Sequence, residues 1–129
     1  FLMTQNRPVN INLLKIKLPL SAFLSITHRV SGILIFFLVL PLSVMVFSEL
    51  THSQDSFDNF MHSYNSNLGI KLGCIGLMLI FQYHIFTGIR HMLMDFHILN
   101  ESLSSSFKSA VVTLILFVVN TLLTFWVMI

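Results

Sequence analysis

Ionisable side chains recur at helical spacing toward the end of an apolar stretch that covers residues 68–94. His84, His91 and Asp95 follow one another at intervals of seven and four residues, which places them on one stripe of a helix. Gly88 falls on the same stripe, one turn after His84. Because an ionisable group in a membrane span is costly to bury, it indicates a functional site by default. We therefore expect this stripe to carry the chemistry of the protein.

His84 lies deepest in this stripe, about 10 Å from His91 along the axis at 1.5 Å per residue. A deep neutral imidazole can hydrogen-bond a neighbouring helix, pass protons, or ligate haem iron through Nε2. Gly88 suits the third use, since a flat macrocycle needs a neighbour without a side chain, but glycine also serves plain helix packing. One such histidine leaves the other axial position to a partner helix. The residues alone leave these three interpretations open.

A second polar cluster lies near the start of the first apolar stretch. Ser25 and Arg29 are four residues apart and share a helix face, with His28 beside them. Arg29 can extend to lipid phosphate at the interface, or it can pair with carboxylates such as haem propionates. A hydroxyl and a guanidinium at this depth can also bind the polar head of a ligand whose tail lies in lipid.

Composition indicates which elements must position these side chains. Of the 129 residues, 55% are hydrophobic and 9% are charged, compared with about 25% charged in soluble domains. This balance excludes a disordered chain and argues against a soluble enzyme. A net charge of +2 is too small to indicate nucleic-acid binding. The single Cys74 excludes an internal disulfide. We predict one all-α integral membrane domain over residues 1–129.

Three apolar stretches are long enough to cross a bilayer as helices. We expect the spans at about residues 20–48, 68–94 and 110–129. Pro41 should distort the first span, because proline lacks the N–H that the helix requires. The connections between the spans, residues 49–67 and 96–109, are rich in Ser, Asn and Asp and are predicted to form turns and loops.

The distribution of positive charge predicts the orientation. Six of the seven Lys and Arg residues flank the N-terminus and the second connection, and Lys71 alone lies at the edge of the first. The positive-inside rule then places residues 1–19 and the second connection in the cytoplasm or its topological equivalent, with the C-terminus on the opposite side. Arg90 and Asp95 would lie near the cytoplasmic boundary and extend to water. The six basic residues are Arg7, Lys15, Lys17, Arg29, Arg90 and Lys108.

Two motifs resemble the cytochrome b556 subunit family of succinate dehydrogenase. The first is Arg7-Pro8-Val9-Asn10 followed by Ser25-Ile26-Thr27-His28-Arg29-Val30-Ser31-Gly32. The second is His84-x-x-x-Gly88-Ile89-Arg90-His91-x-x-x-Asp95. Both occur in the order and at the spacing that suit the first two of three spans.

The resemblance implies a multi-pass subunit of the bacterial inner membrane with no catalytic residue of its own. With a second small membrane-anchor subunit, it would form a helical bundle that holds an iron–sulfur subunit and a flavoprotein, and electrons from succinate would pass to ubiquinone. His84 would ligate the iron of haem b, with the second ligand from the partner anchor. Ser25 and Arg29 would bind the quinone. The haem propionates and pocket would involve His28, Arg29, Gly88 and His91.

Other functions remain open at this point. The same three spans would suit a helix-bundle adaptor without redox chemistry, or a proton-pathway subunit of another membrane complex. The resemblance also extends to fumarate reductases, which use related anchors.

Overall fold

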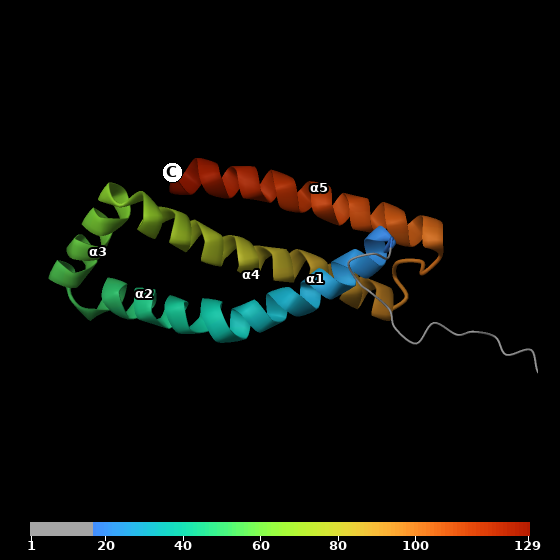
Figure 1. Ribbon diagram of the computed structural model, residues 1–129, viewed down its shortest axis with the longest axis horizontal. Coiled ribbons are helices and arrows are strands. Elements are labelled where there is room, and N and C mark those ends of the chain that lie inside the picture. Colours follow the sequence, from blue (N-terminus) through green and yellow to red (C-terminus); the bar gives the residue numbers. More distant parts are fainter. Residues whose placement is uncertain (1–16) are drawn as a thin grey trace, which may run out of the picture.

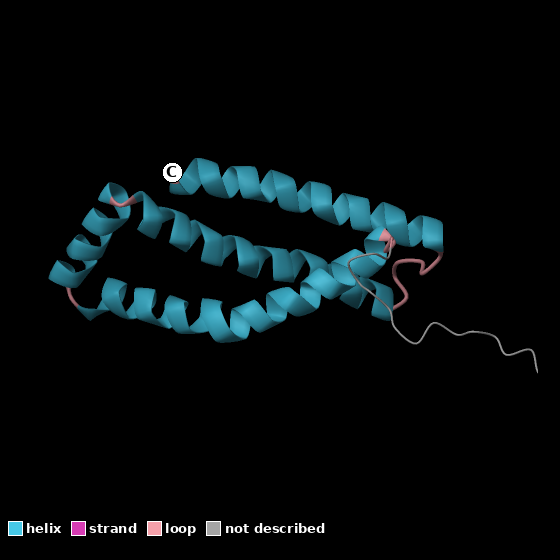
Figure 2. Ribbon diagram, viewed as in Figure 1, coloured by secondary structure: helices cyan, strands magenta, loops and turns pink. Residues whose placement is uncertain are grey.

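The computed structural model describes residues 17–129, and every regular element in that range is helical (Figure 2). The predicted cytoplasmic segment 1–19 falls mostly outside the described residues, as do Arg7, Lys15 and the motif at residues 7–10. The elements in chain order are α1 (Leu20–Leu34), the π-helical turn η1 (Ile35–Val39), α2 (Leu40–His52), α3 (Gln54–Ser66), α4 (Leu68–Asp95) and α5 (Leu103–Met128).

The first predicted span is one continuous helical run that bends in its middle. α1, η1 and α2 follow one another without a break over Leu20–His52, and the ribbon changes direction where α1 passes into α2 (Figure 1). The distortion predicted at Pro41 takes the form of a π-turn, in which the N–H of Leu40 bonds the carbonyl of Ile35. The wider turn accommodates a proline that cannot donate to the preceding turn.

The third span begins earlier than predicted. Ser102 caps α5 by accepting a hydrogen bond from the N–H of Ser105 at 3.3 Å, so the run of serines forms the first helical turn instead of a loop. Serine at the N-cap satisfies an N–H that the helix itself cannot. The loop prediction for residues 102–109 is therefore wrong, and Ser106 and Ser109 are helical residues that face α4.

The first connection is also helical in its interior. Ser53 caps α3 by accepting from the N–H of Ser56 at 3.0 Å, and the predicted turns are confined to the two ends. α3 lies across the end of the bundle (Figure 1). The hydroxyl of Tyr64 donates to the carbonyl of Met128 at 2.6 Å, which ties α3 to the end of α5.

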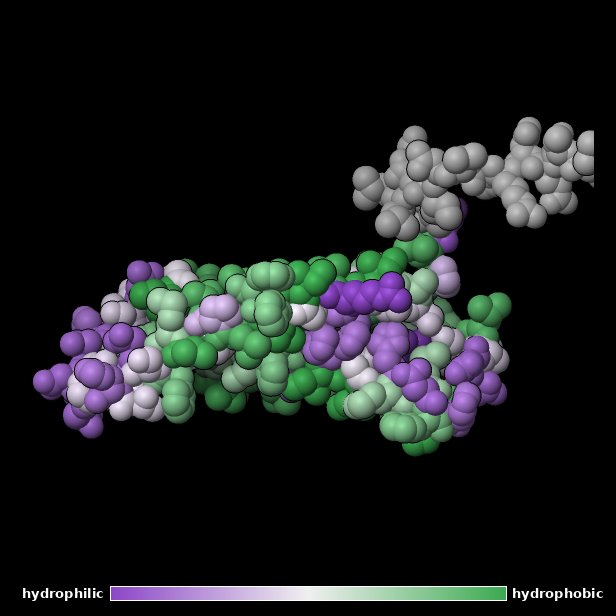
Figure 3. All heavy atoms as spheres, turned by 90° about the horizontal axis from the view of Figure 1, so that it is seen from below, coloured by the Kyte–Doolittle hydropathy of each residue, from purple (hydrophilic) through white to green (hydrophobic). Residues whose placement is uncertain are grey.

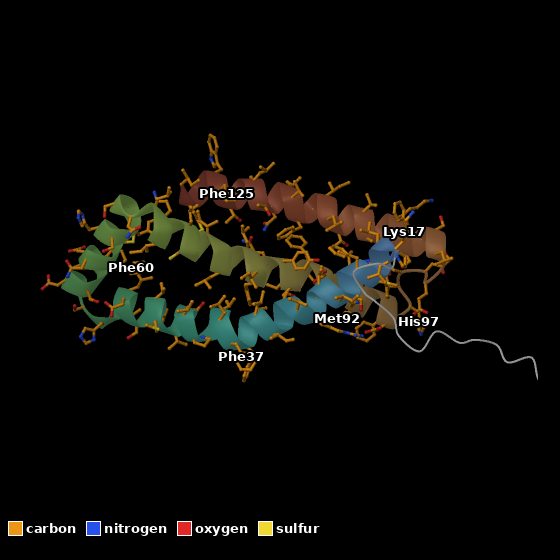
Figure 4. The ribbon with its side chains drawn as sticks, in the orientation of Figure 1. Lys17, Phe37, Phe60, Met92, His97 and Phe125 are labelled. Carbon is orange, nitrogen blue, oxygen red and sulfur yellow. The ribbon has the colours of Figure 1, made fainter. Side chains whose placement is uncertain are left out.

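Three helical runs are long and apolar enough to cross a membrane, over Leu20–His52, Leu68–Asp95 and Leu103–Met128. The chain is thus an all-α, multi-pass membrane protein, as predicted. On the face in Figure 3, hydrophilic residues gather toward the two ends of the bundle, and hydrophobic residues dominate the band between them. Figure 4 places Phe37 on the outside of the bend, pointing away from the other helices. Exposed apolar side chains of this kind suit contact with lipid or with other membrane helices.

The helices pack most tightly at the end where α1 begins and α4 ends. Here α1, α4 and α5 contact one another, and Lys17 and His97 mark this end in Figure 4. Toward α3 the helices α2 and α4 separate (Figure 1). Cys74 and Leu77 of α4 line two apolar cavities there, of about 890 and 840 Å³.

Candidate functional site

The contact between α1 and α4 is built from hydrogen-bonded side-chain pairs. Three hydroxyl-containing pairs cross the interface within about two turns of each helix. The Oγ1 of Thr87 lies 2.8 Å from Nδ1 of His28, and the Oγ of Ser31 lies 2.8 Å from Nδ1 of His84. The third pair joins Thr27 to the hydroxyl of Tyr83. Each helix thus supplies one histidine to a hydroxyl on the other.

The imidazole rings of His28 and His84 stack on each other in this interface. Their centroids are 4.1 Å apart and their planes are inclined by 11°. The ring of His91 completes the group, with its centroid 5.1 Å from that of His28. The sequence left the position opposite His84 to a helix of a partner subunit, whereas the structure brings the stripe of His84, Gly88 and His91 against α1 of the same chain.

Two glycines make room for the two stacked rings. A Cβ on Gly88 would lie 3.1 Å from Cε1 of His28, and a Cβ on Gly32 would lie 3.3 Å from Cε1 of His84. Both distances are shorter than ordinary carbon–carbon contacts, so a side chain at either position would displace a ring. The sequence suggested that Gly88 leaves room for a flat macrocycle, whereas the group that lies against it in the structure is the ring of His28. The matching role of Gly32 was not predicted, although this residue lies in the first motif one position after Ser31.

Arg90 is the most buried charged residue in the described part of the chain. The sequence placed it at the boundary with its side chain in water, but the structure buries it to 2% exposure. Its guanidinium donates to the Oγ of Ser21 at 3.0 Å and to the Oγ of Ser109 at 3.2 Å. It also donates to the carbonyl and the Oγ of Ser106, at 3.1 and 3.3 Å. The prediction failed because α5 begins at Leu103, which brings its serines alongside α4.

A cavity of about 310 Å³ opens beside Arg90 between the ends of α1, α4 and α5. Ser25 and His91 line it together with Arg90, and the apolar wall includes Met94 and Phe107. Of the two residues expected to bind a quinone, Ser25 therefore faces a cavity. Arg29 lies on the exposed surface of α1 and does not line it.

The arrangement combines a histidine cluster within the membrane span with a small cavity at one end, whose walls are mainly apolar and include a few polar groups. Apolar walls with a few convergent polar groups are typical of sites for small molecules. Among the residues described, no group of three or more His, Cys, Asp or Glu side chains could hold a metal ion by itself. A haem requires only axial ligands from the protein, which a single well-placed histidine from this chain can supply in part.

Comparison with known proteins agrees with the family that the two motifs resemble. The family model described as the succinate dehydrogenase/fumarate reductase transmembrane subunit matches residues 3–124. The chain is 39% identical over 93 residues to the succinate dehydrogenase cytochrome b556 subunit of Coxiella burnetii, covering 72% of this chain and 74% of that protein.

Two further relatives are succinate dehydrogenase cytochrome b560 subunits. That of Reclinomonas americana is 32% identical over 97 residues, or 72% of this chain and 67% of its own. That of Porphyra purpurea is 35% identical over 107 residues, or 81% and 83%. The family expected from the two motifs is confirmed, and this chain belongs to the succinate dehydrogenase/fumarate reductase transmembrane subunits.

Proposed function

We propose that this chain is the haem-binding membrane anchor of a succinate dehydrogenase and forms part of its ubiquinone-reduction site. The observation that carries the proposal is the geometry of His84 in a membrane-spanning helix. Its Nδ1 lies 2.8 Å from the Oγ of Ser31, and this is the hydrogen bond that its ring makes within residues 17–129, which leaves Nε2 of this half-buried residue free. The relatives named above are cytochromes, and an imidazole with a free Nε2 is the ordinary axial ligand of haem iron.

The residues present fit one side of a haem b. The rings of His28 and His84 lie face to face at 4.1 Å, which leaves no space for a macrocycle between them. These two histidines therefore cannot bind the iron from opposite sides. The second axial ligand would come from the second anchor subunit, in the helical bundle that the two anchors form. Bound there, the haem would supply a one-electron redox centre between the helices.

The residues around His84 suit the remainder of the haem. Arg29 is exposed on α1, close in sequence to His28, and its guanidinium can pair with a propionate carboxylate through two hydrogen bonds. The ring of His28 stacks on that of His84, and the ring of His91 lies 5.1 Å from that of His28. We assign the propionate contacts to Arg29, His28 and His91. Gly88 belongs to the pocket through the space it leaves for His28.

The quinone site would lie at the end of the bundle that holds Ser25. Its hydroxyl lines the cavity of about 310 Å³, where it would donate a hydrogen bond to a quinone carbonyl oxygen. Arg29, one turn further along α1, would stabilise the negative charge that develops on the quinone as it is reduced. The isoprenoid tail would follow apolar residues of α1, of which Phe23 is half exposed.

The same end of the bundle would face the cytoplasm. The positive-inside rule places Lys17, Arg29 and Lys108 there, and the C-terminus would then be periplasmic in a bacterial inner membrane. The iron–sulfur subunit would dock on this face and carry the flavoprotein, so that electrons from succinate reach the quinone beside Ser25. The three relatives named above are all succinate dehydrogenase subunits, which favours succinate oxidation over fumarate reduction.

Purification of the complex in mild detergent tests this proposal. We expect the chain to carry with it a flavoprotein, an iron–sulfur protein and a second small membrane subunit. The dithionite-reduced spectrum should show the α-band of a b-type haem, and succinate should reduce added ubiquinone. A complex without the α-band would contradict the haem proposal. A complex without the two extrinsic subunits would instead favour an adaptor or a proton-pathway function.

A further inference from the structure

Ser31 lies between the two histidines of the α1–α4 interface. It is 4% exposed, and its Oγ is 2.6 Å from the carbonyl oxygen of His28 and 2.8 Å from Nδ1 of His84. We propose that Ser31 is a positioning residue, which holds His84 in the tautomer that binds iron. This inference rests on the proposed function, in which His84 ligates haem.

The positions of the protons follow from the two distances. A carbonyl oxygen carries no proton, so two oxygens only 2.6 Å apart require the proton of Ser31 between them. The hydroxyl of Ser31 then has only lone pairs left for His84. The contact at 2.8 Å must therefore be a hydrogen bond donated by Nδ1–H of His84. A neutral imidazole has a single N–H, so Nε2 keeps the lone pair that coordinates a metal.

The same contacts fix the plane of the ring. His84 is held at Nδ1 by Ser31 and on one face by the ring of His28 at 4.1 Å. Its Cε1 faces Gly32, where a Cβ would come within 3.3 Å. Rotation of the imidazole would break the hydrogen bond and the stacking together. Ser31 thus selects both the tautomer and the direction of Nε2.

This hydrogen bond also has an electronic consequence. An imidazole that donates its second N–H to an oxygen is a more basic ligand, and a more basic ligand stabilises oxidised iron relative to reduced iron. Loss of the acceptor should therefore raise the midpoint potential of the haem. Loss of such an outer hydrogen bond typically weakens metal binding by about 10–100-fold.

The test compares variants of the purified complex. Ser31→Ala removes the acceptor. Ser31→Cys keeps the branching of the side chain in a slightly larger form but offers only a weak acceptor, which provides a second measurement if the alanine variant does not assemble. Thr113→Val is the matched control, because Thr113 is 8% exposed in α5 and, within residues 17–129, its hydroxyl bonds only the carbonyl of Ser109. The readouts are the midpoint potential by redox titration, the low-spin electron paramagnetic resonance signal, and the rate of haem transfer to excess apomyoglobin.

We expect both Ser31 variants to raise the midpoint potential and to release haem faster than the wild type, while Thr113→Val matches the wild type. An unchanged potential and an unchanged low-spin signal in the Ser31 variants would overturn the inference. An equal shift in Thr113→Val would also overturn it, because the effect would then come from general loosening of the bundle. Retention of the wild-type spectrum by His84→Leu would instead refute the proposed function itself.

Discussion

Substitution of Gly88 by alanine tests the packing of the histidine cluster. The new Cβ would lie 3.1 Å from Cε1 of His28, inside the ordinary contact distance between carbons, so the ring must move by several tenths of an ångström. The ring has little freedom to move, since His28 bonds Thr87 at 2.8 Å and stacks on His84 at 4.1 Å. Overpacking of this kind costs about 1–3 kcal/mol.

A control on the same helix isolates that cost. Alanine is favoured over glycine within a helix by about 1 kcal/mol, and this gain applies equally to Gly88→Ala and to Gly73→Ala. A Cβ on Gly73 meets nothing within 4 Å in this chain, so the second substitution carries the gain without the clash. The difference between the two variants should therefore equal the overpacking cost of about 1–3 kcal/mol. Gly32→Ala should fall between them, because its contact with His84 is longer, at 3.3 Å.

The assay is thermal denaturation of the purified complex, followed by loss of the haem absorbance. Gly88→Ala should have the lowest midpoint, Gly32→Ala an intermediate one, and Gly73→Ala a midpoint at or above that of the wild type. Equal midpoints for Gly88→Ala and Gly73→Ala would refute the reasoning, because His28 would then not pack against Gly88.

Three further predictions concern the orientation in the membrane, the quinone site and helix α3. A cysteine placed at Asp55 should react with a membrane-impermeant reagent from the periplasmic face and one at Ser104 from the cytoplasmic face, and the reverse pattern would contradict the proposed topology. Ser25→Ala and Arg29→Leu should each slow ubiquinone reduction, at or below the lower end of the about 100–1000-fold typical for loss of one donor. Succinate oxidation by a soluble dye should persist in both variants, and an equal loss of the two activities would indicate failed assembly. Tyr64→Phe should lower the stability by about 0.5–1.5 kcal/mol through the lost bond to Met128, with quinone reduction unchanged, and a loss of quinone reduction would contradict a purely structural role.

The membrane spans could be predicted closely from the sequence because long uncharged runs leave few alternatives. The second span was expected at residues 68–94 and is α4, Leu68–Asp95. The polar connections were harder to predict. Serine favours both turns and helix N-caps. Here Ser102 caps α5, and the contact of Ser106 with Arg90 across the bundle stabilises the helical start of that segment.

Some residues of the candidate site could likewise be predicted from the sequence, and others could not. The motif and its spacing singled out His84, Gly88 and His91, because ionisable residues and glycines stand out in an apolar run. Ser31 and Gly32 lie within the first motif, but the sequence alone predicts no role for them, since their function depends on which residues of α4 they face. The burial of Arg90 could not be predicted either, because its hydrogen-bond acceptors lie 16, 19 and 69 residues away in the sequence.

The most direct test of the central claim is the haem signal of the complex that carries His84→Leu. Leucine is well tolerated in a membrane span, so the variant should insert and assemble while it loses the axial ligand. The account predicts loss of the low-spin signal of haem bound by two imidazoles, and retention of that signal in the control His62→Leu, whose histidine is exposed on α3. An unchanged low-spin signal in the His84→Leu complex would show that another residue binds the iron and would contradict the account.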